Sequence, residues 1–144
     1  MYVILKQTKL GGVMILIDYE IKSSPIHGAG MFTRQAIKKG EVIAIASPEL
    51  DVDISVETFN KLQQREKDEI LYWGFYDAPR GVYHVDFDNT KFINHDKNGN
   101  TTQDSEHLEM YLVANRDIEK GEELLQNYLE FETPEEFAQR GIKD

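Results

Sequence analysis

The chain has 144 residues, no cysteine and a formal net charge of −10. This length allows one domain with a buried core, and the absence of cysteine excludes disulfides, thiolate zinc sites and cysteine nucleophiles. Such an acidic surface disfavours direct binding to nucleic acid and suits a basic partner, although acidity also simply keeps a protein in solution.

The longest apolar run, Val13 to Ile17, is much shorter than the roughly 20 residues that span a bilayer. It also lacks the flanks of a signal peptide, so we expect a cytoplasmic protein that does not bind membranes. Residues 1–13 fit the rest awkwardly, because Gly11-Gly12 before Met14 is what a translated ribosome-binding site would encode. A natural start at Met14 and an extra edge strand are two open interpretations.

Short strand patterns dominate the sequence after residue 14. Runs of β-branched and aromatic residues recur, and Gly, Pro or Asn separates them. The expected strands are 15–21, 42–46, 82–87, 110–114 and 123–128. Many short strands with few helices predict a single, mainly β domain of the α+β class.

Two segments have helical patterns. Ser55 can cap a helix that runs through Phe59 towards Ile70, with charged residues on its other face. Near the end of the chain, 133–136 combines a capping box with Pro at the first helical position, and Gly141 is a suitable stop. We therefore expect one helix in the middle of the chain and one near its end.

The pattern I-x-K-G-E occurs twice, at 37–41 and 118–122. In both copies Gly stands where a turn favours a positive φ, and a strand pattern follows. The repeat records either an internal duplication or one turn used twice. It predicts architecture and no chemistry.

Two glycines flank Ala29 in the segment His27-Gly28-Ala29-Gly30. Glycines this close together allow the backbone to approach a ligand. The segment is not a dinucleotide fingerprint, because a third glycine and a following helix pattern are missing. Taken alone, it is better explained as a tight turn.

Asn94 and His95 follow an apolar pair and enter a turn-rich segment, and Tyr128 ends the last strand pattern. Such a histidine is more often a structural hydrogen-bonding residue, but beside an amide at a strand end it can hold a polar ligand. A tyrosine at a strand end is usually a packing residue with a solvated tip. The acids and histidines of 84–96 lack a metal-ligand spacing, and 96–100 lacks the glycine and glutamate positions of an EF-hand, so no metal site is expected.

Taken together, these motifs resemble the SET domain of protein lysine methyltransferases. The resemblance rests on the G-x-G segment 24–41, the asparagine–histidine segment 92–100 and the closing segment 114–128. It implies one SET or β-clip domain over 1–144, with short strands, few short helices and a knot-like C-terminal crossing. Its implied parts are an N-terminal half at 14–47, a variable insert at 48–81, a C-terminal half at 82–128 and a closing segment with a helix at 129–144.

The resemblance also implies a cofactor, S-adenosylmethionine, and roles for individual residues. The cofactor would be cradled by the backbone of His27, Gly28, Ala29 and Gly30. Asn94 and His95 would hydrogen-bond it. Tyr128 would be the catalytic residue where the methyl group passes to nitrogen, and Tyr83 and Tyr128 would line the lysine channel. A narrow apolar channel beside a sulfonium suits this chemistry, because burial and like charge both lower the pKa of the attacking amine.

Several positions depart from the family pattern. Asp96 stands where Ser is usual, and Asn127 stands where Asp often precedes the final tyrosine. No cysteine-rich zinc tail follows Tyr128, so we expect Phe131 or Phe137 to cover the cofactor or the lysine. Four aromatic residues of the insert are candidates for the walls of the lysine channel, with core packing as the preferred interpretation, namely Tyr72, Trp73, Phe75 and Tyr76.

The sequence therefore predicts a protein-lysine N-methyltransferase that acts on a basic, lysine-containing segment of a protein. The alternative is a non-catalytic SET or β-clip module that binds a basic peptide or the cofactor. A module that only binds has no need to keep Asn94, His95 and Tyr128 together. A metal-dependent hydrolase has little support, and the sequence does not decide whether the chain forms oligomers.

Overall fold

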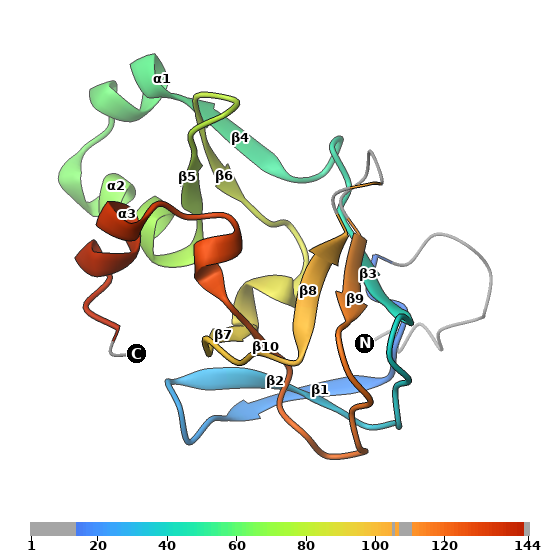
Figure 1. Ribbon diagram of the computed structural model, residues 1–144. Helices are drawn as coiled ribbons and strands as arrows, with labels where there is room; N and C mark the ends of the chain where they lie inside the picture. Colours follow the sequence, from blue (N-terminus) through green and yellow to red (C-terminus); the bar gives the residue numbers. More distant parts are fainter. Residues whose placement is uncertain (1–13, 105, 107–110, 143–144) are drawn as a thin grey trace, which may run out of the picture.

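The computed structural model of the protein describes residues 14–104, 106 and 111–142 (Figure 1). The expectations for residues 1–13 lie outside this part of the chain. Its strands are β1 (Tyr19–Ser23), β2 (Ala29–Thr33), β3 (Val42–Ile45), β4 (Val52–Ser55), β5 (Phe75–Asp77), β6 (Val82–Val85), β7 (Asn94–His95), β8 (Thr101–Asp104), β9 (Tyr111–Ala114) and β10 (Leu125–Gln126). Its helices are α1 (Val56–Lys61), α2 (Gln64–Trp73) and α3 (Pro134–Gln139), with 3-10 turns η1 (Asn89–Phe92) and η2 (Tyr128–Glu130).

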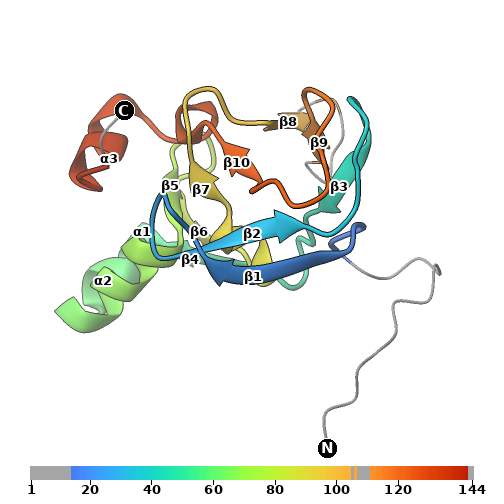
Figure 2. The same cartoon turned by 90° about the horizontal axis from the view of Figure 1, so that it is seen from below.

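Three small sheets form the scaffold and confirm the mainly β prediction. β1 and β2 form an antiparallel pair, β4-β6-β5 form a second sheet, and the third has the order β3-β9-β8-β10-β7. Seen from below, the β1–β2 pair runs between the end that carries α1 and α2 and the end that carries β3 (Figure 2). The scaffold buries an apolar cluster of Ile15, Ile17, Met31, Ile37, Ile43, Ala44, Ile93, Leu112, Ala114, Ile118 and Leu124.

The two I-x-K-G-E turns meet in this core. Ile37 and Ile118 exchange both backbone hydrogen bonds, at 2.9 and 2.8 Å, and bury their side chains. Gly40 and Gly121 have φ values of +87° and +95°, a region that favours glycine. The Gly40 N–H donates to the last carbonyl of β9 and the Gly121 N–H to the last carbonyl of β2, both at 2.8 Å. The repeat is therefore a pair of turns held by equivalent hydrogen bonds.

All three helices are short and have defined starts. The Ser55 hydroxyl caps α1, but the helix does not continue, because Leu62 and Gln63 have extended backbone. The single helix expected after Ser55 is therefore two helices, α1 and α2. Thr133 and Glu136 form the predicted capping box of α3. Among residues 14–104, 106 and 111–142, no helix is long and apolar enough to cross a membrane.

The closing part of the chain passes between two strands that precede it in the sequence. β10 lies between β7 and β8 and pairs with both in parallel. The buried Asn100 amide holds the entry to this crossing, because its Nδ2 donates to Glu123 O and its Oδ1 accepts from the Leu125 N–H, both at 2.8 Å. A Cβ on Gly99 would lie 2.6 Å from Leu125 O, so the two backbones approach too closely for a side chain. This is the knot-like crossing that the resemblance implied.

The strand patterns located some strands and missed others. β3, β6 and β9 coincide with predicted segments and β1 overlaps one, whereas β2, β4, β5, β7 and β8 lie where no strand was predicted. The predicted strand 123–128 contains only the two residues of β10, because Asn127 already caps η2. β2 was missed although four of its five residues are buried, because it begins with two small residues and shows no alternation of apolar and polar residues.

Replacing Gly99 by alanine tests the close approach at the crossing. We expect Gly99→Ala to lower the free energy of unfolding by about 2 kcal/mol or more, because the new methyl group must displace the backbone at Leu125. Gly121→Ala is the control, since its Cβ would meet no atom within 4 Å and only the positive φ costs about 1 kcal/mol. Urea unfolding of both variants measures the difference, and an equal or smaller loss for Gly99→Ala would contradict the steric account.

Candidate functional site

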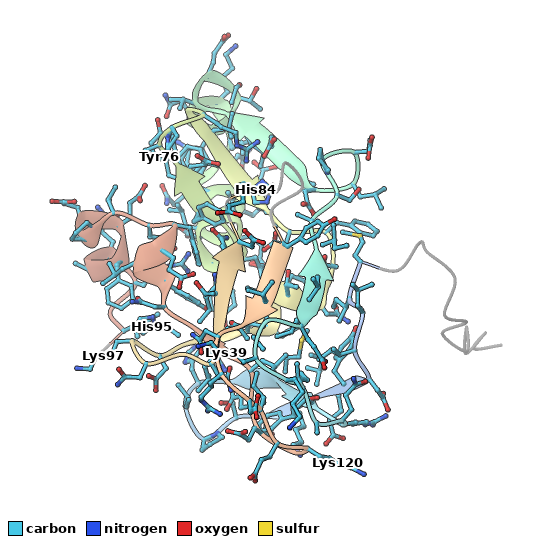
Figure 3. All side chains as sticks on the ribbon, turned by 45° about the vertical axis from the view of Figure 1, so that its right-hand side comes forward. Lys39, Tyr76, His84, His95, Lys97 and Lys120 are labelled. Atoms are coloured by element: carbon cyan, nitrogen blue, oxygen red, sulfur yellow. The ribbon has the colours of Figure 1, made fainter. Side chains whose placement is uncertain are left out.

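Two pockets share a wall that contains Tyr128. The first, called the His27 pocket, has a volume of about 610 Å³, and its lining includes Ile26, His27, Ala29, Asn94, His95 and Gly141. The second, called the His84 pocket, has a volume of about 260 Å³, and its lining includes Asp51, Asp53, Phe75, His84, Asp86 and Phe131. Residues that line both are Tyr72, Trp73, Lys91, Tyr128 and Arg140. Figure 3 shows His84 beside the β4-β6-β5 sheet and His95 at a separate level beside the C-terminal segment.

The sequence-predicted cofactor residues gather at the His27 pocket. His27, Ala29, Asn94 and His95 line it, and so does Tyr128. Gly28 and Gly30 belong to the same turn and strand but are not among the lining residues of either pocket. In the G-x-G segment, the residues that line the pocket are therefore His27, which precedes the first glycine, and Ala29, which lies between the two glycines.

The Asn94 side chain joins this turn to β7. Its Nδ2 lies 2.9 Å from His27 O, 3.1 Å from Ala29 O and 2.9 Å from Glu123 Oε1. Three oxygen acceptors around one atom identify it as the amide nitrogen. The Oδ1 atom is then directed away from them, and it accepts no hydrogen bond from the described residues. Asn94 therefore presents an acceptor where it lines the His27 pocket.

His95 is held inside the fold. Its side chain is buried, and its Nδ1 accepts a hydrogen bond from the Tyr128 N–H at 3.1 Å. Its ring packs against the rings of Tyr128 and Phe137, with centroids 5.3 and 4.5 Å apart. The His95 ring thus fixes the backbone at Tyr128 relative to β7. This is the structural hydrogen-bonding role that the sequence analysis considered for this histidine.

The Tyr128 hydroxyl lies close to the end of η1. It donates to Ile93 O at 2.6 Å, and burial raises its pKa to about 12. The hydroxyl is therefore neutral throughout the physiological range. The Arg140 guanidinium lies 5.4 Å from the centre of the ring. A neutral hydroxyl with a fixed direction, on the wall between two pockets, can orient a polar group without acting as a competing base.

Tyr83 does not join the other predicted site residues. Its ring stacks on Phe59 at a centroid distance of 3.8 Å, packs against Tyr76 at 5.0 Å, and lines neither pocket. Successive side chains of a strand point to opposite faces, so the next residue of β6, His84, lines the pocket instead. Tyr83 as a channel residue therefore stays a prediction that neither pocket supports, and the alternation within 83–86 was the signal that could have identified His84 as a lining residue.

Aromatic residues of the insert form much of the pocket walls. Tyr72 and Trp73 line both pockets and Phe75 lines the His84 pocket, which agrees with their interpretation as wall residues and not with the preferred interpretation of core packing. Tyr72 is 58% exposed, which excludes a core position. Phe131 packs against Phe75 and Tyr128, with centroids 4.6 and 5.3 Å apart, and therefore lines the His84 pocket.

The residue after α3 lies where Phe131 or Phe137 was expected to cover the cofactor or the lysine. Phe137 is buried against His95 and lines neither pocket. Arg140 lines both pockets and pairs with the buried Glu132 carboxylate. It also donates to Gly74 O at 2.6 Å and so fastens α3 to the end of α2. No sequence pattern pointed to Arg140, because its partners lie far away in the chain.

His84 stands among three carboxylates. Its Nδ1 lies 2.7 Å from Asp53 Oδ1, and its Nε2 lies 3.2 Å from Asp86 Oδ1 and 3.9 Å from Asp51 Oδ2. Burial by itself lowers the pKa of His84, but hydrogen bonds to Asp86 and Asp53 and their negative charges outweigh it and raise the pKa to about 9. At neutral pH a positive imidazolium therefore links these acids.

Asp51, His84 and Asp86 also offer ligand atoms that lie within 4.8 Å of one another, close enough to hold a metal ion. The spacing along the chain gave no sign of this group, because Asp51 reaches it from the start of the insert. A protonated His84 offsets one of the negative charges of this group without an ion.

The family comparison agrees with this geometry. The family model of the SET domain matches residues 28–129, which is more than half of the chain. The chain therefore belongs to the SET-domain family, as the sequence motifs predicted. No curated protein sequence gives a significant match.

Solved structures share the fold. The chain is similar to an apo form of Chaetomium thermophilum polycomb repressive complex 2 with mutations in Ezh2, with a TM-score of 0.64 and 22% identity, over 86% of this chain and 16% of that one. An autoinhibited form of that complex bound to S-adenosylmethionine gives a TM-score of 0.62 at 22% identity, over 87% and 17%. A Plasmodium falciparum protein assigned as a histone methyltransferase gives 0.55 at 20% identity, over 78% and 93%. The chain thus spans less than a fifth of the polycomb chains and shares their fold.

The raised pKa of His84 predicts a stability that depends on pH. Its proton is bound more tightly in the folded chain than at the unfolded pKa of about 6.5, so its contribution is complete below pH 6.5 and is lost as the pH rises through about 9. We expect the free energy of unfolding to fall over this window by at most about 3 kcal/mol.

Urea unfolding between pH 6 and pH 9.5 measures this effect, with His84→Gln expected to flatten the profile. His27→Gln is the matched control, because the His27 side chain is exposed and its loss should leave the slope unchanged. A wild-type slope that survives in His84→Gln would assign the dependence to other groups.

Proposed function

We propose that this chain is a protein-lysine N-methyltransferase that uses S-adenosylmethionine. The observation that carries the proposal is the position of Tyr128, whose hydroxyl is anchored on Ile93 O in the wall common to both pockets. In this assignment the His27 pocket takes the cofactor and the His84 pocket takes the substrate lysine. The two would then approach Tyr128 from different sides. Membership of the SET-domain family supports the same assignment.

The residues of the His27 pocket fit the cofactor. Its volume of about 610 Å³ lies within the roughly 300–1,000 Å³ that is usual for cofactor sites. Asn94 offers a free amide oxygen, and Trp73 and Phe92 offer apolar surface. Bound S-adenosylmethionine would supply an electrophilic methyl group on a positively charged sulfur. Asn94 would hold its polar part, with His27 and Ala29 beside it.

The chain's own contribution to the reaction is orientation and exclusion of water. The lysine nitrogen must present its lone pair, so it must first lose a proton that it holds with a pKa of about 10.4. Aromatic walls at Tyr72, Trp73 and Phe75 would desolvate the ammonium and favour the neutral amine. Tyr128, neutral because its pKa is raised to about 12, would direct the amine without taking part as a base. The nitrogen–carbon bond would form as the sulfur–carbon bond breaks, and the methylated amine would release its extra proton to solvent.

A basic protein segment is the proposed substrate. Four aspartates line the His84 pocket, namely Asp51, Asp53, Asp86 and Asp88. With His84 protonated, the same lining also holds four cations, namely Arg80, His84, Lys91 and Arg140, so the pocket itself carries no large excess of negative charge. The net charge of −10 of the whole chain would attract a segment rich in Lys and Arg. This overall charge supports a basic sequence around the target lysine.

Removing the Tyr128 hydroxyl separates methyl transfer from binding. Tyr128→Phe should lower kcat by about 10²–10³-fold, because the group that orients the amine is lost. The Kd for S-adenosylmethionine should change less than about threefold, since that hydroxyl bonds to Ile93 O and not to the Asn94 region. Transfer of labelled methyl groups to a lysine-rich peptide mixture measures the first quantity, and isothermal titration calorimetry measures the second.

Tyr76→Phe is the matched control, because Tyr76 lines neither pocket and should leave both quantities unchanged. A Tyr128→Phe protein with wild-type rate and product would remove the proposed role of Tyr128. If the wild-type chain binds cofactor or basic peptide but transfers no methyl group, the non-catalytic binding module becomes the better description.

Asn94→Ala tests the cofactor assignment of the His27 pocket. We expect the Kd for S-adenosylmethionine to rise about tenfold, because one acceptor for the ligand and the link between β7 and the turn are lost together. Asn98→Ala is the control, since its side chain is exposed in the following loop. Calorimetry on both variants measures the change, and an unchanged Kd for Asn94→Ala would place the cofactor elsewhere.

A further inference from the structure

Glu123 lies at a junction between three segments that are far apart in the chain. Its Oε1 accepts from Asn94 Nδ2 and its Oε2 accepts from Ser24 Oγ, both at 2.9 Å. The carboxylate therefore uses one oxygen for β7 and the other for the turn before β2. Glu123 lines neither pocket, so any effect on a ligand must pass through the residues that it holds.

The first of these residues is Asn94. Its amide nitrogen has two hydrogens and faces three oxygens, of which only Glu123 Oε1 carries a negative charge. A hydrogen bond to a charged acceptor is roughly twice as strong as one between neutral groups. Glu123 is therefore the main electrostatic reason for the amide to direct its nitrogen inward and its Oδ1 away from the turn.

The second residue is Ser24. While it donates to Glu123, its Oγ accepts from the Ile26 N–H at 3.0 Å, and the Ser24 N–H donates to Gly28 O at 2.8 Å. These bonds define the turn that carries His27, whose carbonyl also accepts from Asn94. The Glu123 carboxylate thus fixes both the orientation of the Asn94 amide and the conformation of the turn that lies beside it.

Gly30 shows how tightly this carboxylate fits. A Cβ on Gly30 would lie 2.1 Å from Glu123 Oε1 and 2.8 Å from Glu123 Cδ. A side chain at this position would therefore displace the carboxylate. The second glycine of the G-x-G segment thus has a contact with Glu123 in addition to the cofactor role that the resemblance implied.

We propose that Glu123 is a positioning residue for the cofactor pocket, which it prepares by holding the Asn94 amide and the Ser24–Gly28 turn. This inference rests on the proposed function, because the ligand that benefits is S-adenosylmethionine. Glu123 takes no part in methyl transfer. Its role is to give the His27 pocket the correct acceptor before the ligand arrives.

Three substitutions at the Glu-Glu pair test the positioning role by calorimetry with S-adenosylmethionine. Glu123→Ala should raise the Kd at least tenfold, whereas Glu123→Gln should raise it less than about threefold, because its amide can still accept from Asn94 and donate to Ser24. Glu122→Ala removes the same charge from the neighbouring position, where the side chain pairs with Arg116, and should leave the Kd within about twofold. Thermal unfolding confirms that each protein is folded at the titration temperature.

A double-mutant cycle with Gly30 tests the contact itself. Gly30→Ala should weaken binding about as much as Glu123→Ala, because the methyl group displaces the carboxylate. The Gly30→Ala, Glu123→Ala double variant should then bind no more weakly than either single variant. Fully additive losses would overturn the inference that Gly30 serves Glu123.

The Asn94 side-chain amide gives a reading that needs no ligand. Its two Nδ2–H resonances, identified by their disappearance in Asn94→Ala, should shift in ¹⁵N-labelled Glu123→Ala and stay in place in Glu122→Ala. Unchanged resonances, or a folded Glu123→Ala with wild-type Kd, would overturn the positioning role. A wild-type chain that binds no S-adenosylmethionine would instead overturn the proposed function, and the Asn94 resonances would still decide whether Glu123 holds that amide.

Discussion

The passage of β10 between β7 and β8 is the constraint on which the site depends. β7 has only two residues, and within the described chain its ladder partner is β10. Through this pairing the His95 ring meets the Tyr128 N–H and Ile93 O meets the Tyr128 hydroxyl. The Asn100 amide bonds to Glu123 O and to the Leu125 N–H and so replaces backbone partners at the entry to the crossing. The geometry around Tyr128 is thus a consequence of topology.

Different parts of the chain supply the two pockets. The β1–β2 turn and β7 form one side of the His27 pocket. The insert brings Asp51, Asp53 and Phe75 to the other pocket, and the segment that follows it brings His84, Asp86 and Asp88. Arg140 connects these regions. Its guanidinium bonds to the end of α2 and to Glu132, and it also lies against the Tyr128 ring. The C-terminal helix therefore takes part in both walls, in a chain that has no cysteine for a zinc-bound tail.

Motifs with a fixed order and spacing predicted the family, the crossing and the positions of Asn94 and Tyr128. What they did not predict depends on geometry that a linear pattern does not contain. A shift by one position along β6 exchanges Tyr83 for His84, because the two side chains lie on opposite faces. Asp51 and Arg140 reach the pockets only through long-range folding. Glu123 directly follows the second copy of the repeat, and no pattern singled it out because its partners, Ser24 and Asn94, precede it by many residues.

The crossing also determines the order in which the molecule can be completed during synthesis. β7 and β8 are made before β10, yet in the sheet they are joined only through β10, which lies between them. A growing chain that ends before β10 therefore carries unpaired strand edges next to an open loop at 96–100, and such edges promote association between chains. The part of the sequence that finishes the sheet is the same part that carries Tyr128. A chain that ends before β10 therefore lacks the complete sheet and the wall that contains Tyr128 together.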